Sequence, residues 1–272
     1  MLRLCLACLT ALVPLLLVSG VHGSDGTLPW ASGASDQSPF ELSATRIAGV
    51  IADRADAEAR CEGETEWATL AADRDHEATD LLGYVQFTYQ PEDGGFVLRA
   101  GTLAELSPRA CWHAYEYAKN PNPTCQTGTE RQARRKWVQR PVKAHERVRI
   151  AGRWVTRSSR KKRNVQITTY ANVPIYGLCP PSRDTVFGLW TLAHEAVHLS
   201  GVVQEDVTDC YGLQWIQWTA TQLGASPEYA KMIGAKAWAV YEAEKPFVPA
   251  YYSTECHEDG ALDRSPGDGT WP

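Results

Sequence analysis

The hydrophobic residues of this chain recur with helical spacing in several segments. Between Ala44 and Arg60, the apolar residues Ile47, Val50 and Ile51 fall on one side of a helix. Ser226-Pro227-Glu228 combines an N-cap residue, a proline and an acid, which is typical of a helix start. Helices are therefore predicted over 44–60 and onward from residue 227.

A further helix is predicted between Val186 and Val197, where the apolar run is too dense for a surface helix. Ser182 and Asp184 provide N-cap oxygens ahead of it, and Gly201 can adopt the left-handed conformation that ends a helix. Because this helix is expected to be buried, its polar residues need partners inside the protein.

Alternating, β-branched and aromatic runs predict strands elsewhere. The runs 84–89 and 95–99 are separated by the turn sequence Pro91-Glu92-Asp93-Gly94, which predicts a hairpin. The runs 165–170 and 175–179 are predicted to pair with each other in the same way. Strands mixed with helices in this order indicate an α+β fold.

The predicted buried helix contains His194-Glu195-Ala196-Val197-His198. Residues four apart lie on one face of a helix, so both imidazoles can bind one metal ion. Glu195 lies about 100° round the helix, where it serves as a base for water rather than as a ligand. The alternative is a core helix that happens to carry two histidines, but chance produces this pattern in roughly one such chain in a hundred.

The third ligand is expected from the acids that follow the helix. Glu205 is the predicted ligand, and Asp209, one turn further on, is predicted to orient a ligand histidine. The two roles are open to exchange, and Glu205 as an ordinary acid at a helix N-terminus is the alternative.

Two histidines and one carboxylate leave the fourth position of a tetrahedral zinc site open, which is typical of catalytic sites. We therefore expect one Zn²⁺ per chain, with Glu195 acting as general base and then acid on an activated water. Fe(II), Mn and Co accept the same ligands. A donor for the oxyanion is also needed, and the candidates are Tyr211, Tyr252 and His257.

The N-terminus predicts export. Arg3 precedes an apolar stretch from Leu4 to Val18, and Val21-His22-Gly23 offers a cleavage site. Residues 1–23 are therefore assigned to a signal peptide, and residues 24–43, rich in Ser, Gly, Asp and Pro, to a disordered segment. We expect a secreted protein with no membrane association after cleavage; the alternative is a retained anchor helix.

Six cysteines follow the predicted signal peptide, and an even number in an exported chain predicts up to three disulfides. Cys210 comes directly after Asp209, and we expect Cys256 to be its partner, which would staple the metal-binding region. The candidates are Cys61, Cys111, Cys125, Cys179, Cys210 and Cys256.

Basic residues are concentrated in the segment 131–163, which holds fourteen Lys and Arg against one acid, although the whole chain carries a net charge of −5. The stretch 146–155 alternates well enough for a hairpin, so the simplest interpretation is a solvated hairpin face. The other interpretations are a site for an anionic cell-wall polymer or acidic substrate, and proteolytic processing at 160–163. The predicted export argues against nucleic acid as a partner.

The sequence TLAHEAVHLSGVVQEDVTDCYGLQ, residues 191–214, resembles a group of uncharacterised exported bacterial proteins, mostly actinobacterial, that are described as HExxH zinc metallopeptidases. Four shorter stretches are also similar to theirs: Cys61 with Gly83-Tyr84-Val85, Tyr251 to Cys256, Gly260 to Asp263, and Trp271-Pro272. The resemblance implies His194, Glu195 and His198 as the core of the site.

Glu205-Asp206-Val207-Thr208-Asp209 resembles the E-x-x-x-D element of gluzincins, in which the Glu binds zinc and the Asp supports a ligand His. The number of residues between His198 and Glu205 is smaller than in most gluzincins. Metzincins fit poorly, because their third histidine is replaced here by Gln204.

These features together predict an α+β, zincin-like fold: a small antiparallel sheet over the metal-binding helix, with a helical C-terminal part and disulfide staples. Residues 44–163 are assigned to an N-terminal α/β part that ends in the basic segment, and 164–272 to the catalytic part. The expected function is hydrolysis of peptide bonds in a peptide or protein substrate. The alternatives are a cell-wall amidase or endopeptidase with the same site, and a secreted binding protein with a non-catalytic metal site.

Overall fold

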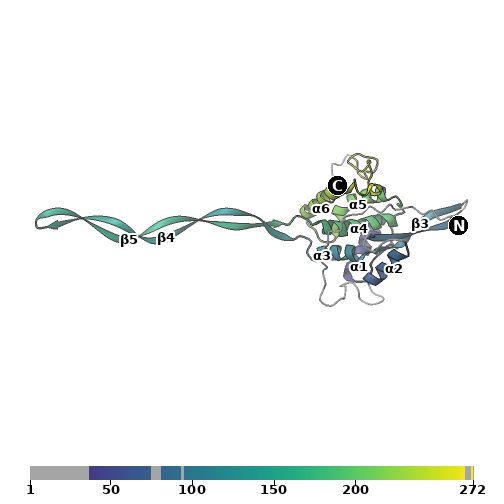
Figure 1. The fold of residues 1–272 in the computed structure, drawn as a ribbon, viewed down its shortest axis with the longest axis horizontal. Coiled ribbons are helices and arrows are strands. Elements are labelled where there is room, and N and C mark those ends of the chain that lie inside the picture. Colours follow the sequence, from purple (N-terminus) through teal and green to yellow (C-terminus); the bar gives the residue numbers. More distant parts are fainter. Residues whose placement is uncertain (1–36, 75–80, 93–94, 267–270, 272) are drawn as a thin grey trace. The chain divides into compact units, whose positions relative to one another are not determined.

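The computed structural model describes residues 37–74, 81–92, 95–266 and 271 (Figure 1). The predicted signal peptide and residues 24–36 of the predicted disordered segment lie outside the described residues. The chain divides into two compact units, residues 123–179 and the remainder. Across the described segments, no helix has both the length and the apolar content needed to cross a membrane.

The first helix, α1 (Pro39–Ala52), begins and ends earlier than the apolar spacing predicts. Ser38 caps it: the Glu41 N–H donates to the Ser38 hydroxyl, and the Ser38 N–H donates to the Glu41 carboxylate. The prediction of disorder was therefore wrong for 39–43. The helix stops because Asp53 adopts a left-handed conformation with φ 53°.

The sheet of the larger unit has three strands in the order β1-β3-β2. β2 (Gly83–Glu92) and β3 (Gly95–Leu106) pair antiparallel, which confirms the predicted hairpin over 84–99. β1 (Glu58–Cys61) pairs parallel to β3 in a region predicted to be helical. β2 and β3 also contact α4 (Arg183–Leu199), the helix that carries the metal-binding motif.

Helix α4 is the centre of the core. Its residues from Gly188 to Leu199 are buried, and it contacts α1, β2 and β3 as well as three other helices: α3 (Pro108–Lys119), α5 (Glu205–Gln222) and α6 (Pro227–Glu244). A Cβ at Gly188 would lie 2.6 Å from the backbone nitrogen of Ala114, so a glycine is needed where α3 crosses α4. The remaining elements are α2 (Glu64–Ala72) and the short η1 (Pro249–Tyr251).

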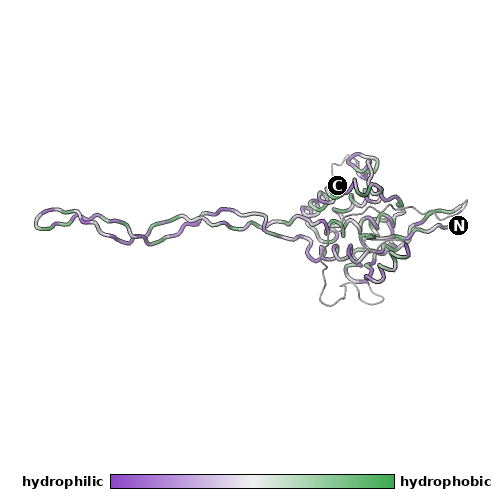
Figure 2. The backbone as a smooth tube through the Cα atoms, in the orientation of Figure 1, coloured by the Kyte–Doolittle hydropathy of each residue, from purple (hydrophilic) through white to green (hydrophobic). Residues whose placement is uncertain are grey.

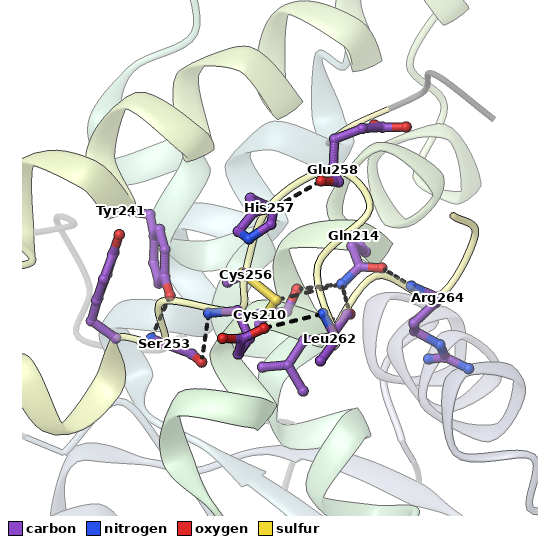
Figure 3. The surroundings of a disulfide bond; sticks show 12 residues. Cys210, Gln214, Tyr241, Ser253, Cys256, His257, Glu258, Leu262 and Arg264 are labelled. Atoms are coloured by element: carbon purple, nitrogen blue, oxygen red, sulfur yellow. Dashed lines mark hydrogen bonds between the residues drawn. A yellow bond between two sulfur atoms is a disulfide. The ribbon is translucent and has the colours of Figure 1, made fainter. Parts of the chain in front are cut away.

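Two disulfides staple the larger unit. Cys61–Cys111 joins β1 to α3, and Cys210–Cys256 joins α5 to the C-terminal segment, as predicted (Figure 3). Cys125 and Cys179 are not bonded to each other. The fold is mixed α+β with disulfide staples, while the zincin-like arrangement stays a prediction.

The smaller unit consists of one long hairpin, β4 (Thr124–Ile150) paired antiparallel with β5 (Arg153–Leu178) (Figure 1). We call this hairpin the ribbon. Its turn is Ala151-Gly152, both with positive φ, which confirms the hairpin predicted over 146–155. Figure 2 shows hydrophilic and hydrophobic residues interspersed along both of its strands.

The predicted pairing of 165–170 with 175–179 was wrong, because both runs belong to the single strand β5. Pro174 between them does not turn the chain: it lies opposite Thr129 within the ladder. In a two-stranded hairpin every strand has a free edge, where a missing proline N–H is tolerated. The predicted boundary between residues 163 and 164 consequently falls inside β5 rather than between compact units.

Candidate metal centre

The two histidines of the motif lie one turn apart on α4, as their spacing predicts. Their rings are 4.7 Å apart between centroids, and both side chains are buried. The helix that positions them begins at the predicted cap, where the Thr185 N–H donates to the Ser182 hydroxyl. It ends at Ser200, and Gly201 follows with φ 97°, which turns the chain towards α5.

Glu205, in the first turn of α5, completes a cluster with both imidazoles. Its Oε2 lies 3.1 Å from Nε2 of His194 and 3.4 Å from Nε2 of His198. These three ligand atoms are close enough to one another to hold one metal ion. Helix α5 reaches this position because Gly212 lets it approach α4: a Cβ there would lie 3.3 Å from the backbone nitrogen of His194.

The opposite nitrogen of each imidazole has its own acceptor. His194 Nδ1 lies 2.6 Å from Oδ1 of Asp209, and His198 Nδ1 lies 2.7 Å from the carbonyl oxygen of Val202. A carbonyl only accepts, so His198 carries its proton on Nδ1 and presents the Nε2 lone pair to the cluster. Acceptors of this kind fix the orientation of metal-binding histidines.

Sequence reasoning placed Asp209 behind a ligand histidine but missed Val202. A backbone carbonyl leaves no residue-type signal in a sequence, so only the fold reveals it. Thr208 also contacts His198: its Oγ1 lies 3.4 Å from His198 Nδ1 and donates to the Gln204 carbonyl at 2.8 Å. The spacing of these residues on α5 sets both carboxylates against His194.

The cluster sets the charge of its members. Burial alone would lower the pKa of His194, but the carboxylates of Asp209 and Glu205 outweigh burial and raise this pKa well above its ordinary value. Burial opposes ionisation of Glu205 as well, yet its hydrogen bonds to His194 and His198 lower its pKa to about 2. Glu205 is therefore an anion at every working pH, as a metal ligand must be.

Glu195 is buried next to the cluster but is not one of the three clustered ligands. Burial raises the pKa of its carboxyl to about 7, against the attraction of the two histidines. Its carboxylate packs on Gly83 at the start of β2, where an added Cβ would lie 2.3 Å from Oε1. Gly83 thus makes room for Glu195, and only the similar stretch Gly83-Tyr84-Val85 hinted at it in the sequence.

Aromatic side chains border the histidines. The Phe87 ring on β2 meets His198 edge-on at 5.8 Å, and the Tyr251 ring lies 6.4 Å from His194, both between centroids. Trp190 is 6% exposed and packs between Phe187 and Tyr241. It also lines a small cavity, shared with Asp209, of about 20 Å³.

The predicted oxyanion donors have other contacts. The Tyr252 hydroxyl accepts a hydrogen bond from Lys245 Nζ at 2.6 Å. His257 Nδ1 lies 2.7 Å from the Glu258 carbonyl, as Figure 3 shows. Arg264 lies over the Tyr211 ring at 5.3 Å. Tyr251, which borders His194, was not among the predicted donors.

The C-terminal segment is tied to α5 near the cluster (Figure 3). Beside the Cys210–Cys256 bond, Gln214 donates to the Leu262 carbonyl at 2.9 Å and accepts from the Arg264 N–H at 2.8 Å. Cys210 directly follows Asp209, so these bonds restrain the helix turn that holds the His194 partner.

In comparisons with known proteins, no family model, no curated protein and no solved structure matches this chain. Two imidazole nitrogens and an ionised carboxylate form a donor set that suits Zn²⁺, so the residues present fit the expected ion.

Proposed function

We propose that this protein is a secreted zinc-dependent peptidase in which His194, His198 and Glu205 hold the metal and Glu195 is the catalytic base. One observation carries the proposal. Glu205 Oε2 lies within 3.4 Å of both Nε2 atoms, whereas the Glu195 carboxylate is buried on the same helix as the histidines and outside the cluster. A carboxylate in this position can act as the base for a water molecule at the cluster.

A Zn²⁺ ion bound by these residues supplies a Lewis acid that polarises a substrate carbonyl and lowers the pKa of water. The remaining chemistry belongs to the chain. Glu195 takes a proton from water and later gives it to the leaving amine. Asp209 and the Val202 carbonyl keep both imidazoles in the orientation that presents Nε2.

The substrate proposed is an extended polypeptide. β2 is an edge strand of the three-stranded sheet, and its Phe87 contacts His198. An extended chain can pair with such an edge through main-chain hydrogen bonds, which would bring a peptide carbonyl to the cluster.

Export is part of the proposal. The apolar stretch after Arg3 supports it, and the two disulfides favour an oxidising compartment. A cell-wall amidase or endopeptidase would use the same cluster on another polymer, and the basic ribbon favours that variant of the function.

The deciding experiment measures metal content and peptidase activity on the full chain, produced by export so that its disulfides form. We expect about one zinc per chain, lost in His198→Ala, and cleavage of unfolded protein or of cell-wall peptide. Glu195→Gln should keep the zinc and lose at least a hundredfold in activity, because it removes only the base.

The matched control is Asp206→Asn, which changes an acid in the same helix turn as Glu205 that is not part of the cluster. It should retain zinc and activity. Full zinc with no activity in the wild type on either substrate would favour the binding-protein alternative, and a folded protein without zinc would refute the peptidase.

A further inference from the structure

The ribbon is unusually long for a two-stranded hairpin. Its strands of 27 and 26 residues are several times longer than the usual five or six. At about 3.3 Å per residue it extends for roughly 85 Å. Isolated two-stranded hairpins are only marginally stable in water, so a ribbon of this length needs a source of stability beyond its own ladder.

The basic residues of the ribbon cover both of its faces. Residues directly opposite each other share a face, and successive residues alternate between faces, so the register assigns every side chain. Of the fourteen Lys and Arg in 131–163, seven fall on each face. Within 131–163, therefore, neither face of the ribbon is free of positive charge.

Several of these charges repel one another. Arg140 lies directly opposite Arg163, and Lys143 lies directly opposite Arg160. Like charges in opposed positions destabilise a hairpin. The only acid of the segment, Glu146, pairs with Lys161. The rest of this positive charge lacks an acidic counterpart within 131–163, and a bound polyanion would neutralise it.

Ten of the fourteen basic residues are arginine. Arginine binds phosphate with two parallel hydrogen bonds, which lysine cannot do. Because the charges follow both faces of a twisted ribbon, a flexible linear polymer can contact them in succession, whereas a rigid duplex would contact one face. The chemistry fits a chain of phosphodiesters.

The exposed aromatic residues do not suit nucleic acid. Proteins that bind single strands stack successive bases on neighbouring rings. Here Trp137 and Trp154 are exposed, but Trp154 pairs with Arg149, twelve residues along the ribbon from Trp137, which is roughly 40 Å. Tyr170 and Tyr176 are exposed as well, and Arg131 lies over the Tyr170 ring at 4.2 Å. They lie opposite Ala133 and Gln126, so neighbouring rings along the ribbon are at least four residues apart, which is roughly 13 Å.

We propose that the ribbon is a binding site for a flexible, linear phosphodiester polymer without bases, of the poly(glycerol phosphate) type found in cell walls. Binding neutralises the opposed arginines and lysines and orders the ribbon. This inference does not depend on the metal centre or on peptidase activity.

The test is titration of the full chain with labelled poly(glycerol phosphate) at several salt concentrations. We expect binding that weakens steeply with salt, because each neutralised phosphate releases counterions. The ribbon variant Arg140→Gln/Lys143→Gln/Arg160→Gln/Arg163→Gln should weaken binding at least tenfold and flatten the salt dependence. Its loss of affinity will not come from unfolding, because the substitutions remove repulsion between opposed charges.

The matched control removes four exposed basic residues from the larger unit, Arg46→Gln/Arg109→Gln/Lys231→Gln/Lys236→Gln. Both variants lower the net charge equally, so the control should keep affinity within about twofold if the ribbon is the site. Amide hydrogen exchange in 124–178 should slow when polymer is added.

Three outcomes would overturn the proposal. The first is no binding by the wild type at about 0.1 M salt, where the Debye length is about 10 Å. The second is equal weakening in both variants, which would indicate attraction by net charge alone. The third is tighter binding of a thymidine oligonucleotide with the same number of phosphates, which would identify nucleic acid as the ligand.

Discussion

The metal centre and the ribbon handle charge in opposite ways. In the metal centre, two buried histidines lie among three carboxylates at the edge of the core, and each imidazole nitrogen faces an oxygen within 3.4 Å. In the ribbon, fourteen cations are spread over an exposed hairpin with one acid among them. Burial forces charges to be compensated inside the fold, whereas exposure leaves compensation to solvent or to a partner.

The metal centre and the ribbon should therefore respond to different solution conditions. In the metal centre, the buried Glu195 carboxyl has a pKa of about 7, so pH should act there. The charges of the ribbon belong to exposed arginine and lysine side chains, so salt and polyanions should act on the ribbon instead.

Removing the metal should make the stability of the larger unit depend on pH through Glu195. Its folded pKa of about 7 exceeds the ordinary value of 4.5, so folding favours the protonated form. This contribution is complete below pH 4.5 and is lost as the pH rises through 7, which amounts to about 3 kcal/mol. Glu195→Gln should flatten the dependence in denaturant unfolding of the metal-free protein between pH 5 and 8.

Asp209→Asn should lower zinc affinity by about 10- to 100-fold, because the amide holds His194 less well than the carboxylate does. Competition with a chelator measures this affinity. Asp206→Asn in the same helix is the control and should leave it unchanged. Equal affinities in the two variants would mean that Asp209 does not support the metal site.

Gly83→Ala should displace the Glu195 carboxylate, since the new Cβ would lie 2.3 Å from Oε1. We expect about 1 kcal/mol of destabilisation and a lower kcat with little change in zinc content. Gly95→Ala is matched to it, because it is also the first residue of a strand and a Cβ there meets nothing within 4 Å. If both variants behave alike, Gly83 does not position Glu195.

The smallest expected effect is a disulfide between Cys125 and Cys179, which would change the ribbon alone. Cys125 lies opposite Gly177, and the Cys179 N–H donates to the Pro123 carbonyl, so the two residues flank the base of the ribbon. Their thiols interact, since a hydrogen bond to Cys125 raises the pKa of Cys179. We predict that an exported thiol–disulfide oxidase takes two electrons and two protons from them to form a third disulfide.

Thiol alkylation followed by mass spectrometry measures that disulfide in the exported protein. No alkylated cysteine should be found in the wild type, and Cys125→Ser should leave Cys179 alkylated. Zinc content should be equal in both proteins, because the cysteine pair belongs to the other compact unit. Two alkylated cysteines in the wild type would show that the ribbon is not stapled.

The sequence predicted those parts of the molecule that depend on local spacing. His194 and His198 lie on one face because helical periodicity alone puts them there. The hairpin turn at Ala151-Gly152 and the caps at Ser182 and Ser226 also depend only on residues that are neighbours in the sequence. The capping box at Ser38 was equally local but was overlooked in a segment with a disordered composition.

Other errors arose where a local signal competes with a long-range one. Residues 165–178 contain a proline and an asparagine that are typical of a turn, yet β4 offers them a continuous partner strand. Parallel pairing of β1 with β3 overrode the helical pattern that ends at Arg60. Strand pairing depends on a partner distant in the sequence, which a window of local residues does not contain.

The sequence by itself determined the chemistry available: a helix with two histidines and a glutamate, acids after it, six cysteines after the predicted signal peptide, and a concentrated run of cations. The tertiary structure alone decided how these are combined. It set Glu205 rather than Asp209 against both Nε2 atoms, gave His198 the Val202 carbonyl, placed Glu195 on Gly83, and paired Cys61 with Cys111. Each of these depends on distances between separate elements, which the packing of α4 against its neighbours fixes and residue spacing does not.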